Sequence, residues 1–531
     1  MPTPIRPDRL RFHLLRINYD RKLTNYLVAG FETGFPINHT NHAYDVQAGN
    51  AKQVHDLPDT VASKLDREMQ AGRIAGPFPS PPFSPFQVSP LNLREKKSSD
   101  ASVRSYRLLH NLSYPYDDKA VNANIPDSFK TVKYTTVGDA IRKLLELPYG
   151  AYSAKTDIAD AYRLIPVSPL DYPKLGMQFK GQYFYDKCLP QGCSSSCRIF
   201  ETFSTAIQAI FESTVPDVQC VHMIDDFFVM ARDFKTCASH LNTLLGLCAD
   251  IGIPMAPGKT TEPSTTTTFL GISLNSQNGT ATLPTDKLLS YSKDITELLC
   301  HKKVKRKSME SIIGKLNFAA SVVPARPFLR RMIDTLSAAP RPYHYIRLTN
   351  EVKQDLRTWL VFLTTYNGVT YFRALNITPS DSIHMASDAS KHGFGAVYGR
   401  RWLQAPYPTS WQHFHITILE LYPILVMVHV FGHLLRNSNI LFHCDNSAVV
   451  AILNKQSSKD KTVMKLVRPL VLYLVGHNIS LRSIHIPGLL NVLPDKISRF
   501  QVTPSLLLHF NMDLKATPVP EGLLPSNFAI C

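Results

Sequence analysis

Two adjacent carboxylates, Asp225 and Asp226, interrupt the apolar run that extends from Val221 to Met230. Neighbouring negative charges repel each other, and apolar flanks make both costly to desolvate unless a cation is present. The pair therefore indicates a divalent-metal site at the tip of a β-hairpin. Because Asp-Asp pairs also occur in ordinary turns, the choice between these interpretations depends on the rest of the chain.

A third carboxylate and a glycine-containing turn precede this pair. Asp157 lies where an expected strand in the segment 153–166 breaks, and Leu189-Pro-Gln-Gly192 is a tight turn that opens an expected helix over residues 195–210. Backbone N–H groups at such a turn suit a phosphate ligand. Three acids beside it would hold two cations about 3.5–4 Å apart, which suits activation of a primer 3′-hydroxyl and stabilisation of the leaving pyrophosphate.

Four more acids each stand at the end of an expected strand or near the start of an expected helix. The strands cover residues 383–388 and 440–445, and one helix covers residues 416–435. An acid near a helix N-terminus is usually a cap or a dipole partner. Together the four suit a second two-metal phosphodiester site; they are Asp388, Glu420, Asp445 and Asp495.

The elements that must position these acids follow from the pattern of apolar residues. Val61 to Ile74 has helical spacing, and residues 91–111 resemble two strands joined by a polar tip. Short apolar strands alternate with helical stretches from Tyr149 to Leu274, and a fresh αβ pattern runs from about 383 to 499. The pattern predicts a multidomain α+β protein.

Composition narrows the class of protein and of partner. The chain has 531 residues, 44% of them hydrophobic, and a net charge of +16 from 58 basic and 42 acidic side chains. A chain this basic usually meets a polyanion, most often nucleic acid, although a merely basic soluble enzyme is the alternative. Nine scattered cysteines without a C-x-x-C pair predict a reduced, intracellular protein in the cytoplasm or nucleus.

No membrane partner is expected from the sequence. The N-terminal residues are basic and lack the apolar core of a signal peptide. The most apolar helix, residues 419–435, contains Glu420, Pro423, His429 and His433, so we do not expect it to span a bilayer.

The order of motifs in the first half of the chain resembles that of reverse transcriptases, from about residue 55 to 340. The palm motifs of that family are similar to Asp157-x-x-Asp-Ala-Tyr162, Leu189-Pro-Gln-Gly192 and Met223-Ile-Asp-Asp226. Further similarity lies at Val103 to Leu112 (fingers), at Gly252 with Gly258-Lys259 (the next motif) and at Phe269-Leu-Gly271 (the primer grip).

This resemblance implies roles for individual residues. Asp157, Asp225 and Asp226 would hold two Mg²⁺ or Mn²⁺ ions. Tyr162 would block a ribose 2′-hydroxyl, and Lys259 would lie near the triphosphate as a proton donor. The full set expected to contact nucleotide or template is Lys96, Lys97, Arg107, Tyr162, Gln191, Gly192 and Lys259. A core aromatic is the alternative for Tyr162, and a solvated charge is the alternative for the lysines.

Two positions depart from the family pattern. Met223 stands where an aromatic residue usually precedes the acids, which affects the expected primer contacts and not metal binding. Ser194-Ser-Ser-Cys197 replaces a stretch that often carries proline, so the following helix is expected to start differently.

Residues 380 to 500 resemble a ribonuclease H domain. Asp388, Glu420, Asp445 and Asp495 would hold two metal ions there, and His485 fits the mobile catalytic histidine of that family. The second glycine pattern of the family is altered, so a surface or core histidine is the alternative for His485.

The resemblance implies a right-hand polymerase (fingers, palm, thumb) followed by an RNase H-like α/β domain. The expected segments are an N-terminal extension (1–55), fingers and palm (56–280), a basic helical thumb and connection (281–378), the RNase H-like domain (379–500) and a C-terminal tail (501–531). The expected partners are an RNA template, a DNA primer, RNA–DNA hybrid and deoxynucleoside triphosphates. Lys302 to Lys307 would contact phosphates or act as a nuclear localisation signal.

Ser311 to Phe318, His485 to Gly488 and Asp495 to Arg499 look most like DIRS-type, tyrosine-recombinase retrotransposons. Too few residues follow the nuclease segment for a recombinase, which we expect on another chain or in a missing portion of the element. The leading function is an RNA-directed DNA polymerase with ribonuclease H activity. The alternatives are a decayed or domesticated nucleic-acid-binding protein and an unrelated metal-dependent nuclease.

Overall fold

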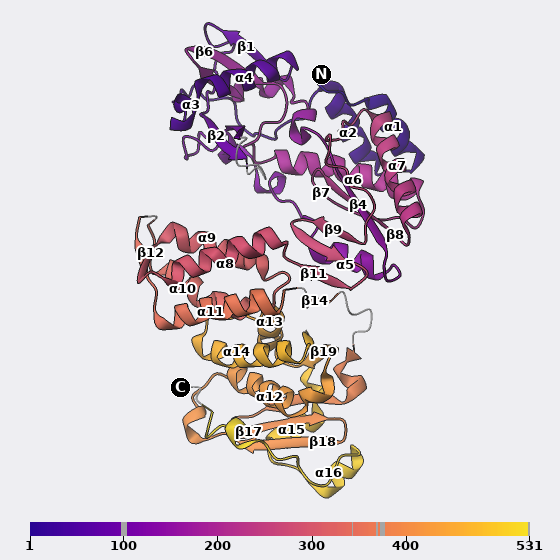
Figure 1. Ribbon diagram of the computed structural model, residues 1–531, viewed down its shortest axis with the longest axis vertical. Coiled ribbons are helices and arrows are strands. Elements are labelled where there is room, and N and C mark those ends of the chain that lie inside the picture. The colour runs from indigo at the N-terminus through magenta and orange to yellow at the C-terminus, as the bar shows by residue number, and fades with distance from the viewer. Residues whose placement is uncertain (97–103, 342, 368–369, 372–377, 529–531) are drawn as a thin grey trace. The chain divides into compact units, whose positions relative to one another are not determined.

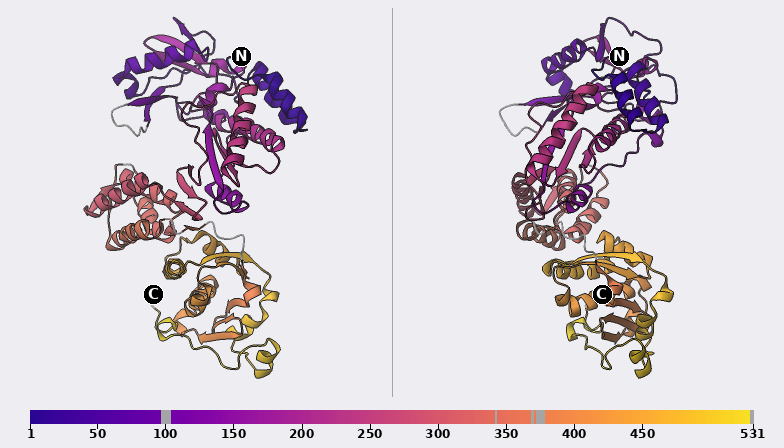
Figure 2. Two further views of the ribbon diagram at one scale, coloured as in Figure 1. Left: turned by 45° about the vertical axis from the view of Figure 1, so that its right-hand side comes forward. Right: turned by 90° about the vertical axis from the view of Figure 1, so that its right-hand side faces the viewer.

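The computed structural model describes residues 1–96, 104–341, 343–367, 370–371 and 378–528 (Figure 1). The chain divides into two compact units, Met1–Leu270 and Gly271–Cys531. Both contain helices and sheets, as the two further views also show (Figure 2), so the predicted α+β fold class is confirmed.

The central sheet of the first unit carries the acids of the first site. It has the order β4-β8-β7 and is antiparallel throughout, with strands β4 (Tyr152–Asp157), β7 (Gln219–Met223) and β8 (Asp226–Ala231). Five of the six residues of β8 are buried, because helices α6 (Ser196–Thr214) and α7 (Phe234–Ile251) cover the sheet. Helix α5 (Val137–Leu145) packs on β7, and β9 (Thr266–Phe269) lies beside β4.

A second part of this unit is built from two smaller sheets. One is the hairpin of β2 (Leu91–Lys96) and β3 (Ser105–His110), which confirms the two expected strands. The other has the order β1-β6-β5, with β1 (Ile74–Phe78), β5 (Gly176–Phe179) and β6 (Gln182–Asp186). Helices α3 (Lys52–Asp56) and α4 (Pro58–Gln70) share a small core with them. The expected helix over 61–74 was too long, since Ile74 already belongs to a strand.

The N-terminal residues form an integral part of this unit. They fold into α1 (Pro7–Arg16) and α2 (Arg21–Thr33), which Asp20 caps by accepting a hydrogen bond from the Leu23 amide. Leu10 and Leu14 are fully buried in the same core as α6 and α7. The sequence showed little periodicity here because only a narrow stripe of each helix is apolar.

The first part of the second unit contains a short β-hairpin followed by four helices. The helices are α8 (Thr285–Leu299), α9 (Arg306–Ala319), α10 (Arg330–Ser337) and α11 (Asn350–Thr365). A two-stranded ribbon, β12 (Lys303–Lys305) with β13 (Tyr345–Arg347), connects them. Strands β10 (Ile272–Asn275) and β11 (Thr280–Thr282) form a hairpin before α8, and β14 (Thr370–Tyr371) pairs with β11.

The rest of this unit places two three-stranded sheets beside each other. One is antiparallel, β16 (Met385–Ala389), β17 (Gly393–Tyr398) and β18 (Arg401–Pro406). The other is parallel, β15 (Thr378–Pro379), β19 (Asn439–Cys444) and β20 (Ser480–His485), and β16 lies next to β19. Acids at the ends of β16 and β19 are thereby brought to one edge.

Five helices surround these strands. They are α12 (Ile416–Phe431), α13 (Ser447–Lys455), α14 (Lys461–Gly476), α15 (Val492–Ser498) and α16 (Pro504–His509). Helix α12 is apolar on every side and, with the following turn to Leu435, is long enough to cross a bilayer, but 72% of its most apolar window is buried inside the protein. It therefore packs as a core helix, against β16, β17 and α14.

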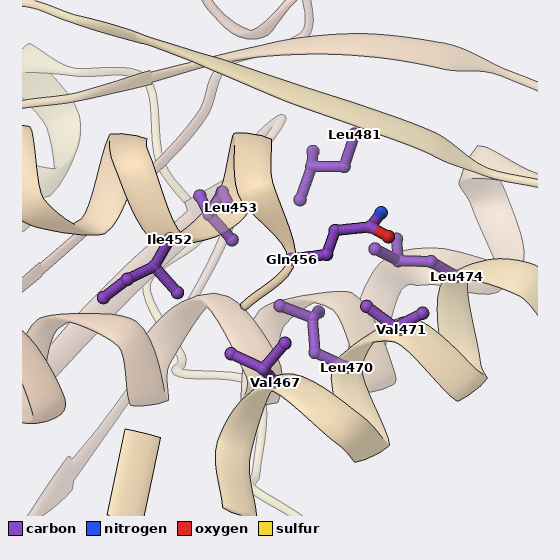
Figure 3. Close-up of a pocket in the computed structure, with 8 residues that line it drawn as sticks. All are labelled: Ile452, Leu453, Gln456, Val467, Leu470, Val471, Leu474 and Leu481. Carbon is purple, nitrogen blue, oxygen red and sulfur yellow. The ribbon is translucent and has the colours of Figure 1, made fainter. Parts of the chain in front are cut away.

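Apolar packing also fixes β20, which carries His485 at its end. Helices α13 and α14 meet beside this strand, and their side chains enclose a small pocket, largely apolar (Figure 3). The lining residues are Ile452, Leu453, Gln456, Val467, Leu470, Val471, Leu474 and Leu481.

Residues 501–528 pack on the part of the second unit that contains β16–β20 rather than extending from it. Leu507 and Met512 are buried in a cluster with Trp402, whose indole N–H donates to the Asp513 carbonyl at 2.7 Å. The Tyr422 hydroxyl donates to the Leu523 carbonyl at 2.7 Å. Long-range contacts of this kind leave no periodic signal, which is why the segment read as a tail.

Two candidate metal-dependent active sites

Strand register brings the three acids of the first site together. Asp157 lies opposite Asp226 in the β4–β8 pairing, and the Ile158 amide donates to the Asp225 carbonyl at 2.9 Å. Met223 pairs with Asp226 across the β7–β8 hairpin, so Asp225 occupies its tip, as the apolar run predicted.

The hairpin tip is held by an acid that sequence reasoning missed. Ile224 has a φ of 57°, which a β-branched residue adopts only when its surroundings enforce it. Its amide donates to Glu201 on α6 at 3.1 Å, and the other oxygen of Glu201 lies 3.3 Å from His222 on β7. Glu201 stands in the expected helix without a recognisable motif, so the sequence gave no signal for this role.

Burial and mutual repulsion raise the pKa of the two hairpin carboxylates, Asp225 and Asp226. Burial, together with the charges of Asp157 and Asp225, raises the pKa of Asp226 to about 6, although Lys155 opposes the rise. Burial and Asp157 also raise the pKa of Asp225. Such a site favours a bound cation, since a cation stabilises the ionised form of all three acids.

The expected cationic residues occupy different positions around this site. Lys259 forms an ion pair with Asp157, Nζ to Oδ1 2.8 Å, and its own side chain is 60% exposed. Arg107 is exposed on β3, and its charge lowers the pKa of Asp225. Lys96 ends β2, and Lys97 lies outside the described residues.

Tyr162 lies between the first site and the start of α6. Its ring packs edge-on against Phe200, with centroids 5.7 Å apart, and its hydroxyl is 3.0 Å from the Cys197 sulfur. Burial raises the pKa of Tyr162, and the charge of Asp225 contributes to that rise. The residue is therefore partly a core aromatic and partly a neighbour of the acids.

The Pro-Gln-Gly turn is docked on β3 through backbone contacts. The His110 amide donates to the Gln191 carbonyl at 3.2 Å. Gly192 has a φ of 140°, and a Cβ there would lie 2.0 Å from the His110 carbonyl oxygen. Its missing side chain thus permits close approach to protein backbone. Helix α6 starts at Ser196, and Ser195 donates to the Ile37 carbonyl instead of capping the helix.

A buried ionic network lies behind the turn. Arg163 donates to Asp186 and to Glu68, each at 2.8 Å, and His110 lies 3.0 Å from Asp186. It ties β3, β6 and α4 to the segment after Asp157. Arg163 directly follows Tyr162 in the chain, but nothing in the sequence indicated its partners.

The four acids of the second site line one cleft. Asp388 lies on β16, Asp445 follows β19, Glu420 lies in the second turn of α12 and Asp495 in α15. They share a cleft of about 760 Å³. The structure thus places together four acids that the sequence analysis had assigned to one site.

The electrostatics of this cleft also favour a bound cation. Burial raises the pKa of Glu420 to about 7 and that of Asp388 to about 6, with Asp445 adding to both. One Glu420 oxygen is buried without a hydrogen-bond partner. An unpartnered buried carboxylate oxygen is costly, and a metal ion would satisfy it.

The spacing of the possible ligand atoms in this cleft also suits a metal ion. One ligand atom from each of Glu420, Cys444 and Asp445 lies within 4.8 Å of the others, the only such three-ligand group among the residues that the structure describes. Burial raises the pKa of the Cys444 thiol to about 12, so the donors at neutral pH are carboxylate oxygens, which Mg²⁺ and Mn²⁺ prefer. In the first site one Asp157 oxygen is already engaged by Lys259.

Neighbouring polar groups orient the acids of the cleft. Ser498 donates to Asp388 at 2.7 Å, Asn491 to Asp445 at 3.2 Å, and Arg499 to Asp495 at 2.7 Å. Sequence reasoning missed Ser498. His485 is exposed at the end of β20, where Nε2 lies 3.2 Å from the Asp445 carbonyl oxygen.

Comparison with known proteins agrees with this geometry. Residues 95–274 match the family "Reverse transcriptase (RNA-dependent DNA polymerase)". The chain is 32% identical over 114 residues to the Pol polyprotein of equine infectious anemia virus (19% of this chain, 10% of the relative). It is 23% identical over 192 residues to the Pro-Pol polyprotein of simian foamy virus type 1 (36% and 15%). It thus spans only a small part of the length of either relative.

A solved foamy viral protease-reverse transcriptase in complex with dsDNA has a similar fold. The TM-score is 0.51 at 14% identity, and the alignment covers 90% of this chain and 96% of that one. The predicted polymerase fold is therefore supported by sequence and by structure. Residues 95–274 of this chain form a reverse transcriptase domain.

Proposed function

We propose that this protein is an RNA-directed DNA polymerase that also cleaves the RNA strand of RNA–DNA hybrids. The observation that carries the proposal is the convergence of Asp157, Asp225 and Asp226 at one hairpin tip within the reverse transcriptase domain. The raised pKa of the two adjacent acids fits a site built to bind cations.

Two Mg²⁺ or Mn²⁺ ions per site would polarise the reacting phosphate and neutralise the charge that develops on it. Around the first site, the position of Arg107 suits contact with an incoming triphosphate. Tyr162, close to Asp225, is placed to exclude a ribose 2′-hydroxyl. Gln191, whose carbonyl accepts a hydrogen bond from the His110 amide, would contact the nucleotide or template.

The proposed nuclease activity belongs to the second acidic cleft. The cleft of Asp388, Glu420, Asp445 and Asp495 supports it, because four acids that share one cleft with an unsatisfied carboxylate oxygen suit phosphodiester hydrolysis. His485, exposed beside Asp445, is placed to assist release of the product. Copying RNA leaves a hybrid, so a hybrid-specific nuclease explains why both sites occur on one chain.

The proposed partners are RNA template, DNA primer, RNA–DNA hybrid and deoxynucleoside triphosphates. The dsDNA in the solved foamy viral relative supports a nucleic-acid duplex as ligand. We further propose that the chain derives from a DIRS-type retroelement whose recombinase is encoded elsewhere, and that it acts inside the cell, in cytoplasm or nucleus.

The test uses the full chain in two assays, primer extension on an RNA template and cleavage of a labelled hybrid, each with Mg²⁺ and with Mn²⁺. Asp225→Asn with Asp226→Asn should abolish extension and leave cleavage, while Asp388→Asn should do the reverse. Asp217→Asn, an exposed acid beside β7, is the control and should retain both activities.

Extension by the double Asn variant at the unmodified rate would show that the first site is wrongly assigned. If the unmodified protein shows neither activity but binds hybrid tightly, the result would favour a nucleic-acid-binding protein without catalysis.

A further inference from the structure

The ribbon of β12 and β13 joins the helices of the second unit and lies where α8 ends and α9 begins (Figure 1). Lys303 pairs with Arg347 and Lys305 with Tyr345, so these four side chains share one face. Val304 and Ile346, which alternate with them, are 6% and 4% exposed. The ribbon thus has one face in the core and one face in solvent.

The solvent face is basic and aromatic. The exposed side chains of this face and of the residues that flank the two strands are Lys302, Lys303, Lys305, Lys307, Arg341, Tyr343, Tyr345 and Arg347. Tyr343 and Tyr345 are 66% and 56% exposed. In the part of the chain that the structure describes, none of these six cations lies within ion-pair distance of a carboxylate. We call this set the basic ribbon face.

This composition is unfavourable for the ribbon alone. Lys303 and Arg347 are directly opposed like charges, which destabilise an antiparallel pair. Lys303 lies over the Tyr345 ring, Nζ 5.3 Å from the centroid, so a cation and an aromatic plane are presented together. An anionic ligand with planar groups would relieve the repulsion and use the rings.

The face is held rigidly from behind. Arg306, next to Lys305, donates to the carbonyls of Leu336 and Ala339, and its Nε donates to Glu310 at 2.7 Å. The Arg306 amide donates to the His344 carbonyl at 2.9 Å, which extends the pairing of the two strands. These contacts also argue against a localisation signal read in the folded protein, because Arg306 and Val304 face inward.

We propose that the basic ribbon face binds a single strand of RNA, the lysines and Arg347 contacting phosphates and the two tyrosines stacking on bases. Exposed ring faces require unstacked bases, which a single strand offers and a duplex does not. Only the choice of RNA rests on the proposed function, in which the template is RNA. The site is separate in sequence from all seven catalytic acids, so binding does not depend on catalysis.

The test measures equilibrium binding of a fluorescent 20-nucleotide RNA to the full chain, without metal or nucleotides, over a range of salt concentrations. Lys303→Ala with Arg347→Ala should lower the salt slope by about 1.4, since a single strand loses about 0.7 per phosphate contact. Tyr345→Ala should weaken binding by roughly tenfold, and Tyr345→Phe should retain it because the ring remains.

The matched control is Arg21→Ala with Lys22→Ala, which removes the same two charges from exposed positions of α2. Ultraviolet crosslinking of a 4-thiouridine RNA should label the peptide that carries Tyr343 and Tyr345. A DNA strand of equal length should show the same losses, because neither contact requires a 2′-hydroxyl.

Three results would overturn the proposal. One is unchanged RNA affinity and salt slope in the ribbon variants with melting temperatures like that of the unmodified protein. Another is a loss confined to hybrid duplex, which would assign the face to duplex binding. The third is crosslinking only to other peptides. If the unmodified protein binds the RNA through this face but extends no primer, the proposed function is wrong and the RNA-binding site is still supported.

Discussion

Lys259 is the residue whose position in the structure changes its interpretation most. The sequence placed it near a triphosphate as a proton donor, whereas the structure pairs it with Asp157 at 2.8 Å. Its charge also lowers the pKa of Asp225 and Asp226, which burial raises. Lys259 therefore acts as a counter-charge for the acids in this conformation.

We expect Lys259→Met to raise the pKa of the two hairpin acids, because it removes a nearby positive charge. The acidic limb of the pH–rate profile for primer extension should move to higher pH by about 0.5 unit. Lys259→Arg keeps the charge and should keep the limb in place. A change confined to the alkaline limb would instead identify Lys259 as a proton donor alone.

Glu420 makes the protein without metal sensitive to pH. Burial raises its pKa to about 7, above the ordinary value of 4.5, so the folded protein holds a proton that the unfolded chain releases. Its contribution to stability is complete below pH 4.5 and is lost as the pH rises through 7. The loss should be about 1 kcal/mol, because the side chain is only partly buried.

The measurement is urea unfolding at pH 5 and pH 8 in the presence of EDTA. Glu420→Gln should remove part of the decrease between the two values and should also weaken Mg²⁺ binding in the cleft. Asp217→Asn is again the control and should behave like the unmodified protein. If the free energy of unfolding decreases equally between pH 5 and pH 8 in Glu420→Gln and in the unmodified protein, Glu420 is ionised at both pH values.

At the scale of elements, one buried acid connects helices from two parts of the second unit. Asp355 on α11, 2% exposed, lies 2.9 Å from Arg331 on α10 and 3.2 Å from Arg468 on α14. The Arg468 guanidinium also lies 5.9 Å from the centre of the Phe328 ring. Asp355 thus links the helices before residue 366 to α14.

We expect Asp355→Asn to lower the free energy of unfolding by about 3 kcal/mol, because it leaves two partly buried guanidinium groups without a counter-charge. Glu297→Gln, which breaks an exposed pair with Lys293, should change it by less than about 1 kcal/mol. Urea unfolding followed by circular dichroism measures both. A loss below 1 kcal/mol for Asp355→Asn would show that the pair is solvated.

Gly192 illustrates a requirement for glycine that the sequence alone could not explain. The turn lies where the sequence placed it, and glycine is required there. The requirement, however, comes from the His110 carbonyl, which a Cβ would approach to 2.0 Å. Local sequence showed that the backbone must come close to something, and only packing decided that this is a strand of the same protein.

At the scale of the whole molecule, two compact units each carry one set of acids. Metal binding to folded protein stabilises it, by about 2.7 kcal/mol at a metal concentration a hundred times the dissociation constant. Mg²⁺ should therefore raise the melting temperature, and EDTA should reverse the rise. Asp225→Asn with Asp226→Asn should remove only the Mg²⁺-dependent stabilisation of the first unit. Asp388→Asn should remove only the Mg²⁺-dependent stabilisation of the second unit.

Differential scanning calorimetry with and without Mg²⁺ checks this expectation. A shift that survives in a protein carrying all three substitutions would place the stabilising cations elsewhere.

The acids and their order along the chain could be predicted from the sequence, because motif residues occupy fixed offsets from strand and helix ends. The net charge of +16 follows directly from the composition. Strands β2 and β3 and the hairpin tip at Asp225 could also be predicted, since their periodicity is local. The N-terminal helices and residues 501–528 could not, since their burial depends on surfaces far away in the chain. Glu201, Arg163 and Ser498 were missed for the same reason.

Sequence alone determined which side chains are available for metal chemistry, and its charge predicted a polyanion as the partner. Tertiary structure decided which Asp157 oxygen is engaged by Lys259 and which Glu420 oxygen has no hydrogen-bond partner. It also decided that Lys303 and Lys305 of the basic segment share one face of a ribbon. The reason is distance along the chain: Asp157 and Lys259 are 102 residues apart, and local propensity carries no information about contacts at that separation.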